Sequence, residues 1–145
     1  MFINDQFNFK FNLTDINWIQ LPQEEKIKKS INLDCIEVLF NPALKKEVCI
    51  YYLGELANST LKDYFDYFSY MKTRKNDVLT KEIININSNF ESLKLKYVNS
   101  NGQKFIDYYF IINKRGEMGK VQILVTNEVE DDNILKEVVR SWKHI

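Results

Sequence analysis

The residues that most often do chemistry in proteins are scarce in this chain and form no recognisable set. The single histidine, His144, stands beside the last residue and is expected to be solvated at a frayed helix end. The cysteines, Cys35 and Cys49, are too few and wrongly spaced for a structural zinc site. The segment Gly116-Glu117-Met118-Gly119 lacks the lysine of a phosphate-binding loop and is predicted to be a hairpin turn. The spacing of the serines suggests no partner base. We therefore expect no catalytic residue, no metal site and no cofactor.

Carboxylates offer the remaining chemistry, and one group of them has a simple explanation. Paired carboxylates serve general acid–base catalysis, and an acidic run precedes the last predicted helix. Its members are Glu128, Glu130, Asp131 and Asp132. Negative charge at a helix N-terminus is stabilised by the helix dipole, and solvation accounts for the rest. We interpret this run as part of the helix start.

Asp107 is less easily explained, because it interrupts a strongly apolar segment. Seven of the eight residues from Phe105 to Ile112 are apolar or aromatic. A carboxylate inside such a segment is costly unless it is paired or lies near the end of the sheet. We expect a satisfied or partly exposed carboxylate, with contact to a ligand as the alternative. Burial without a partner would favour the ligand.

The same segment indicates the architecture that positions Asp107. A strand of this composition must be covered on both sides. Successive side chains alternate across a strand, so Ile106, Tyr108, Phe110 and Ile112 face one way and Asp107 faces the other. The sequence therefore predicts a sheet between two layers.

Further strands and two amphipathic helices supply the rest of the fold. Branched and aromatic residues predict a meander of four strands at 79–87, 90–98, 104–113 and 120–126. Earlier strands are predicted at 7–13, 18–21, 35–40 and 47–53, and residues 23–32 form a short helix or a mobile excursion. One covering helix is expected after a Ser59 cap, and a second near Asn133. The predicted class is α+β, an antiparallel sheet sandwiched between helices.

The two cysteines fall on the hairpin formed by strands 35–40 and 47–53. Its expected register places Val38 opposite Cys49 and turns Cys35 to the other face of the sheet. A disulfide is unfavourable in that geometry. We expect two buried thiols that act as small hydrophobic residues.

Composition sets the limits on partners. The chain of 145 residues suits one domain spanning 1–145. Lys plus Arg equals Asp plus Glu at 20 each, which argues against a nucleic-acid partner. Residues Met1 to Leu13 resemble neither a secretory signal nor a membrane span. We expect a cytoplasmic protein with no direct membrane insertion.

Three segments together resemble a known family. They are the Phe7-x-Phe9-x-Phe11 strand leading to Trp18, the helix start Ser59-Thr60-Leu61-Lys62-Asp63-Tyr64, and the ending Val139-Arg140-Ser141-Trp142-Lys143. This layout is similar to the PsbP-like and DcrB-like superfamily, which includes the Ran-binding Mog proteins and the Eag chaperones of type VI secretion. The resemblance implies an α/β/α sandwich. It also implies a largely non-catalytic protein that binds other proteins as an adaptor, chaperone or subunit.

Within that superfamily, the Eag chaperones resemble this chain in length. They shield hydrophobic helices of secreted effectors in a groove on a homodimer. This chain differs in placing Lys94 and Lys96 on a predicted strand, which argues against a wholly apolar groove.

These observations lead to a functional hypothesis and two alternatives. We expect a non-enzymatic module that binds another protein, with a homodimer as one form of that interaction, and an exposed apolar patch of roughly several hundred Å². Tyr67 and Tyr70 lie off the apolar stripe of their helix and are the candidate partner-binding residues, unless they pack against loops. The alternatives are a toxin-neutralising immunity protein, and a small-ligand or enzymatic pocket around Asp107.

Overall fold

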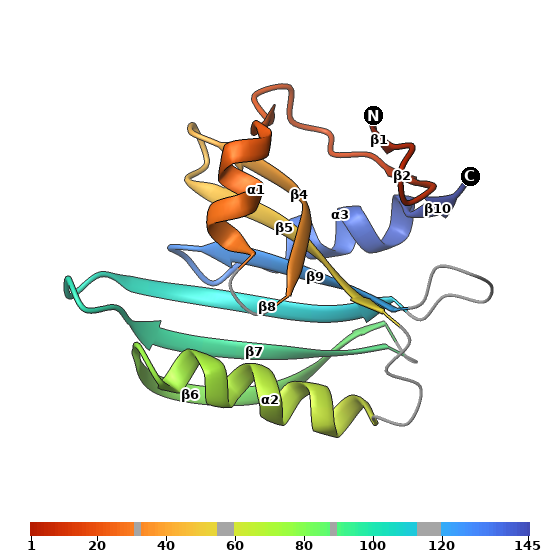
Figure 1. Cartoon of the computed structure of the whole chain (residues 1–145). Helices are drawn as coiled ribbons and strands as arrows, with labels where there is room; N and C mark the ends of the chain where they lie inside the picture. Colours follow the sequence, from red (N-terminus) through yellow and green to blue (C-terminus); the bar gives the residue numbers. More distant parts are fainter. Residues whose placement is uncertain (31–32, 55–59, 88–89, 113–119) are drawn as a thin grey trace.

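A seven-stranded antiparallel sheet forms the centre of the protein (Figure 1). The computed structural model describes residues 1–30, 33–54, 60–87, 90–112 and 120–145. In spatial order the strands are β3 (Ile19–Gln20), β4 (Asp34–Asn41), β5 (Lys46–Gly54), β9 (Lys120–Asn127), β8 (Lys104–Ile112), β7 (Phe90–Val98) and β6 (Asp77–Asn87). The predicted meander is confirmed, because β6 to β9 are neighbours in chain order. Strand β9 then pairs with β5 and joins the meander to the β4–β5 hairpin.

Helices lie on both faces of this sheet, which confirms the predicted α+β class. Helix α3 (Asn133–Ser141) covers one face, together with a small sheet of β1 (Phe2–Asn4), β2 (Phe9–Phe11) and β10 (Lys143–His144). Helix α2 (Leu61–Thr73) covers the other, and α1 (Gln23–Lys29) lies beside β4. We call the two sides the α3 face and the α2 face. The uncertain segment 23–32 thus contains a helix.

The central strand β8 is buried on both sides, as its composition requires. Tyr108 and Phe110 belong to the hydrophobic cluster of the α3 face, which contains Leu135 and Val138 of α3. Tyr109 belongs to the cluster of the α2 face. The alternation predicted for this strand is therefore confirmed, and Asp107 shares the α2 face with Tyr109.

The two ends of the chain lie side by side on the α3 face (Figure 1). Phe9 stacks on Trp142 with ring centroids 4.4 Å apart. The predicted first strand is shorter than expected, since only Phe9–Phe11 pairs, and it belongs to the small sheet. The expectation that His144 ends a frayed helix is wrong, because α3 stops at Ser141 and residue 144 pairs with Phe9 in β10. The stacked rings hold the last strand in place.

The predicted placement of the cysteines is half right. Val38 does pair with Cys49, and both thiols are free and buried. Cys35 nevertheless lies on the same face as Cys49, contrary to the expected alternation. The reason is a β-bulge: Cys35 pairs with Tyr51 and Glu37 pairs with Ile50, so Ile36 is an extra residue that shifts the alternation by one.

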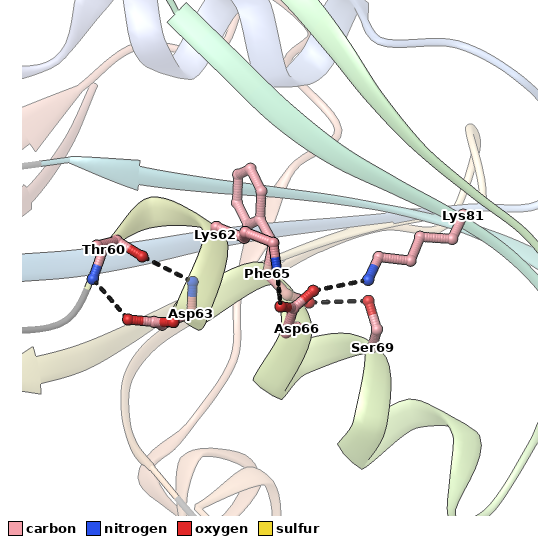
Figure 2. Close-up of polar contacts among 7 residues, drawn as sticks. All are labelled: Thr60, Lys62, Asp63, Phe65, Asp66, Ser69 and Lys81. Carbon is pink, nitrogen blue, oxygen red and sulfur yellow. Dashed lines mark hydrogen bonds and ion pairs between the residues drawn. The ribbon is translucent and has the colours of Figure 1, made fainter.

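Helix α2 begins at a capping box one residue later than predicted. Ser59 lies outside the described residues, and Thr60 is the N-cap. The Asp63 backbone N–H donates to the Thr60 hydroxyl at 3.1 Å, and the Thr60 N–H donates to the Asp63 carboxylate at 3.1 Å (Figure 2). Two backbone donors that the helix leaves unpaired are satisfied in this way.

We predict that Thr60→Ala lowers the free energy of unfolding by about 1 kcal/mol, because the hydroxyl acceptor is lost. Urea denaturation followed by circular dichroism measures the change. Thr60→Ser is the matched control and should stay close to the parent. Equal stability of the alanine variant and the parent would contradict the assigned cap.

Candidate functional site

Asp107 is fully buried and has three partners. Its side chain is 0% exposed, and Lys72 of α2 approaches Oδ2 with Nζ at 2.8 Å. The hydroxyl of Tyr97 donates to Oδ1 at 3.1 Å, and the hydroxyl of Tyr109 donates to Oδ2 at 3.1 Å. A buried carboxylate with three donors is satisfied by the protein itself. Asp107 is thus buried with partners, which does not favour the ligand alternative, and its contact with a ligand stays a prediction.

Two of the partners of Asp107 also contact each other. Lys72 also lies over the ring of Tyr97, with Nζ 4.5 Å from the centroid. Burial, and after it the negative charge of Asp107, raises the pKa of Tyr97 and of Tyr109. Both tyrosines consequently act as neutral hydrogen-bond donors at physiological pH.

We predict that Asp107→Asn lowers the free energy of unfolding by roughly 3 kcal/mol, because Lys72 loses its buried counter-charge. Urea denaturation measures the loss. Asp66→Asn is the control, since Asp66 also forms ion pairs, with Lys62 and Lys81, but on the surface (Figure 2). That exposed change should cost less than about 1 kcal/mol. Similar losses in the free energy of unfolding for the two variants would contradict the conclusion that burial makes the Asp107 ion pair matter more than the exposed one.

We predict that stability falls as the solution becomes more alkaline than about pH 10, the ordinary pKa of tyrosine. Burial raises the pKa of Tyr51, Tyr97 and Tyr109, and it raises the pKa of Tyr108 to about 12. A group whose pKa is raised by folding contributes stability below its unfolded pKa and loses it as pH rises toward its folded pKa. Tyrosinate absorbance should titrate later in the native protein than in urea. Coincident titration curves would contradict these buried environments.

A cleft lies beside the Asp107 cluster, on the α2 face between α1 and α2. It has two chambers that share the side chains of Lys29, Tyr51, Lys72 and Leu124. The first chamber has a volume of about 230 Å³ and the second about 470 Å³. Tyr109 borders the first chamber and Tyr97 the second. We call the two chambers together the α1–α2 cleft.

The α1–α2 cleft carries a small excess of positive charge. Its lining contains five lysines and two glutamates: Lys29, Lys45, Lys46, Lys72 and Lys75, with Glu47 and Glu128. Three of these lysines have carboxylate partners, since Lys29 binds Glu47 at 2.8 Å, Lys72 binds Asp107, and Lys46 binds Asp131. Within the described part of the chain, no ion pair engages Lys45 or Lys75. The cleft can therefore attract an anion.

The floor of the first chamber contains a buried amide. Gln122 of β9 is 3% exposed, lies next to Tyr51 of β5 in the sheet, and lines the chamber. Among the described residues its Oε1 atom has no hydrogen-bond partner, and because that atom is inaccessible to solvent it does not face the chamber. Buried acceptors in proteins are normally satisfied, so this atom calls for an explanation. Apolar walls come from Leu33, Phe68, Met71 and Leu124.

The two predicted partner-binding tyrosines occupy different places. Tyr67 is 41% exposed, lines the first chamber, and meets Phe68 edge to face at 6.0 Å. Tyr70 is 63% exposed and is absent from the lining of both chambers. The structure thus brings Tyr67 together with the partners of Asp107. Partner binding by either tyrosine stays a prediction.

The acidic run before α3 is engaged by lysines as well as by the helix start. Glu130 pairs with Lys94 and also with Lys96, the latter at 3.1 Å. Asp131 accepts the backbone N–H of Asn133 at 2.9 Å. The run therefore ties the start of α3 to neighbouring strands, and the lysines of β7 are used within the protein. The predicted glycine turn at 116–119 lies outside the described residues.

Sequence reasoning missed Lys29, Tyr51 and Gln122. Lys29 belongs to segment 23–32, for which the sequence allows a short helix or a mobile excursion, and the other two look like ordinary strand residues. Gln122 carried a signal, because it is the one polar residue between Val121 and Val125. Like Asp107, Gln122 is a polar residue inside an otherwise apolar strand, and burying such a side chain is costly unless it makes specific contacts.

Comparison with known proteins supports the fold. The chain matches the solution structure of cyanobacterial PsbP (CyanoP) from Synechocystis sp. PCC 6803, with a TM-score of 0.56 and 13% sequence identity. The match covers 99% of this chain and 91% of that one. No family model and no curated protein matches the sequence. The fold is therefore PsbP-like, and at this identity the likeness extends to the fold alone.

No helix in the described ranges is long and apolar enough to cross a membrane. Among the same residues, no three His, Cys, Asp or Glu side chains are grouped as metal ligands.

Proposed function

We propose that this protein is a non-enzymatic binding module, an adaptor or chaperone, that receives an acidic segment of another protein in the α1–α2 cleft. One observation carries the proposal. Five lysines and two glutamates line the cleft, whereas the whole chain has a formal net charge of +0. Three of these lysines are paired with carboxylates, so the positive charge beside this concave, partly aromatic surface is that of Lys45 and Lys75, with Glu128 in the same chamber as Lys45. Complementary charge favours an acidic partner and speeds its association.

The lining also suits a protein partner in its apolar content. Aromatic and methionine side chains are enriched at protein interfaces, and Tyr67, Phe68 and Met71 lie together at the first chamber. Lys75 and Lys45 stand at different chambers, so an extended segment crossing both meets a cation at each. An acidic segment therefore fits better than the hydrophobic helix that an Eag-type chaperone shields.

A cytoplasmic location suits a chain with two free, buried thiols. A toxin-neutralising immunity protein is the same proposal with a toxin as the partner. The PsbP-like fold is compatible with each of these and selects none of them.

The proposal predicts that a photo-crosslinking residue at Tyr67 captures a different protein in the native cell, through a segment rich in Asp and Glu. Tyr70 is the matched control, because it lies on the same helix and is more exposed but stands outside the cleft lining. Mass spectrometry of the crosslinked peptide identifies the segment. Lys75→Glu should abolish the crosslink, and Lys62→Glu, on the outer side of α2, should leave it.

Several results would contradict the proposal. They are equal capture at positions 67 and 70, a captured segment without acidic residues, or no loss of capture in Lys75→Glu. Capture of a second copy of this chain would replace the proposed partner with a homodimer.

A further inference from the structure

We infer that Cys35 and Cys49 are the site of a reversible disulfide, formed when hydrogen peroxide oxidises the two thiols. This inference goes beyond the proposed function and does not depend on a partner in the cleft. Two features of the pair carry it: the contact between the thiols and the charged groups beside them.

The two thiols are neighbours across the β4–β5 hairpin. The β-bulge at Ile36 turns Cys35 to the α2 face, where it packs with Val38 and Cys49 in one small cluster. The thiols of Cys35 and Cys49 are hydrogen-bonded to each other. The arrangement in which a disulfide is unfavourable, with the thiols on opposite faces of the sheet, is therefore absent.

Joining the thiols requires a small local movement. Cys35 pairs with Tyr51, two residues along β5 from Cys49, so the two cysteines are diagonal neighbours. Diagonal neighbours in a sheet are about 7–8 Å apart, whereas the Cα atoms of a disulfide are usually about 4.4–6.8 Å apart. The strands must approach each other at the bulge, where their pairing is already interrupted. A bridge made in this way is readily reduced, as in disulfides that sense oxidants.

The surroundings of the two thiols give them different roles. A hydrogen bond with the Cys49 thiol lowers the pKa of Cys35 against the effect of burial, and the positive charge of Lys29 acts in the same direction as the hydrogen bond. The same hydrogen bond, together with burial, raises the pKa of Cys49. Cys35 is also the more accessible of the two, at 6% exposed against 1%. Cys35 is thus the thiol that attacks the oxidant, and Cys49 is the thiol that closes the bridge.

The reaction balances with hydrogen peroxide as the oxidant. The Cys35 thiolate attacks one peroxide oxygen, the O–O bond breaks, and a sulfenic acid and one water form. Cys49 Sγ lies 3.2 Å from Oε1 of Glu47, a carboxylate that can take up the proton of this thiol. The Cys49 sulfur then attacks the sulfenic sulfur, the S–O bond breaks, and a second water leaves. The two thiols lose two electrons and two protons, and both protons end in water.

The pair lies behind the wall of the α1–α2 cleft. Glu47 and Tyr51 line the cleft and alternate onto the same face of β5 as Cys49. Glu47 also binds Lys29 of α1 at 2.8 Å, and α1 packs against β4, the strand of Cys35. A bridge therefore joins the strand beneath α1 to the strand that supplies the cleft wall.

The test treats the reduced, intact chain with hydrogen peroxide under native conditions and then alkylates it in urea. Mass spectrometry of the parent should show the loss of two hydrogen atoms and no alkylated cysteine, and dithiothreitol should restore both thiols. In Cys49→Ala, dimedone added with the peroxide should label Cys35 as its sulfenic acid. Cys35→Ala is the matched control, in which Cys49 should be labelled about tenfold more slowly. Circular dichroism checks that each variant is folded.

Specific outcomes overturn the inference. They are a peroxide-treated parent in which both cysteines are still alkylated, a disulfide that joins two chains, and labelling of Cys49 in Cys35→Ala as fast as that of Cys35 in Cys49→Ala. The parent chain alone decides whether the bridge forms, so that result does not depend on the folding of a variant. None of these measurements involves the crosslink at Tyr67, so the disulfide site and the proposed function can fail separately.

Discussion

The ion pair between Asp107 and Lys72 connects the middle of the sheet to the helix that covers it. Asp107 lies on a strand whose neighbours exclude water, so the carboxylate is tolerable only because Lys72, Tyr97 and Tyr109 surround it. The same contacts fix the positions of these three side chains at the edge of the α1–α2 cleft. One buried charge thus couples the packing of α2 to the shape of the adjacent surface.

Much of the fold follows from alternation and periodicity. The doubly apolar strand from Phe105 to Ile112 required two covering layers, and the meander followed from turn residues and branched side chains. The errors were local. An extra residue at Ile36 reversed the expected direction of Cys35, and stacking on Phe9 replaced a frayed end with a short strand after Trp142. Neither a bulge nor a long-range ring contact leaves a periodic signal in the sequence.

The site was less predictable than the fold, because its residues come from distant parts of the chain. Asp107 was noticeable as a charge in an apolar strand, and Tyr67 as an aromatic residue off the helical stripe. Their shared cleft was not foreseeable, since it depends on Lys29 of α1 and Gln122 of β9 reaching the same chamber. Lys94 and Lys96 lie on the α3 face, opposite the cleft, where both pair with Glu130 of the segment before α3.

The central claim is that the α1–α2 cleft is the binding surface of this protein. Amide NMR spectra recorded during titration with a blocked peptide of glutamate residues test it most directly. The account predicts that the largest shifts cluster at Lys29, Tyr51, Lys72 and Gln122. These residues come from α1, β5, α2 and β9 but meet at the first chamber. Shifts that centre on the exposed edge strand β6, or that scatter over surface lysines outside the cleft, would contradict it.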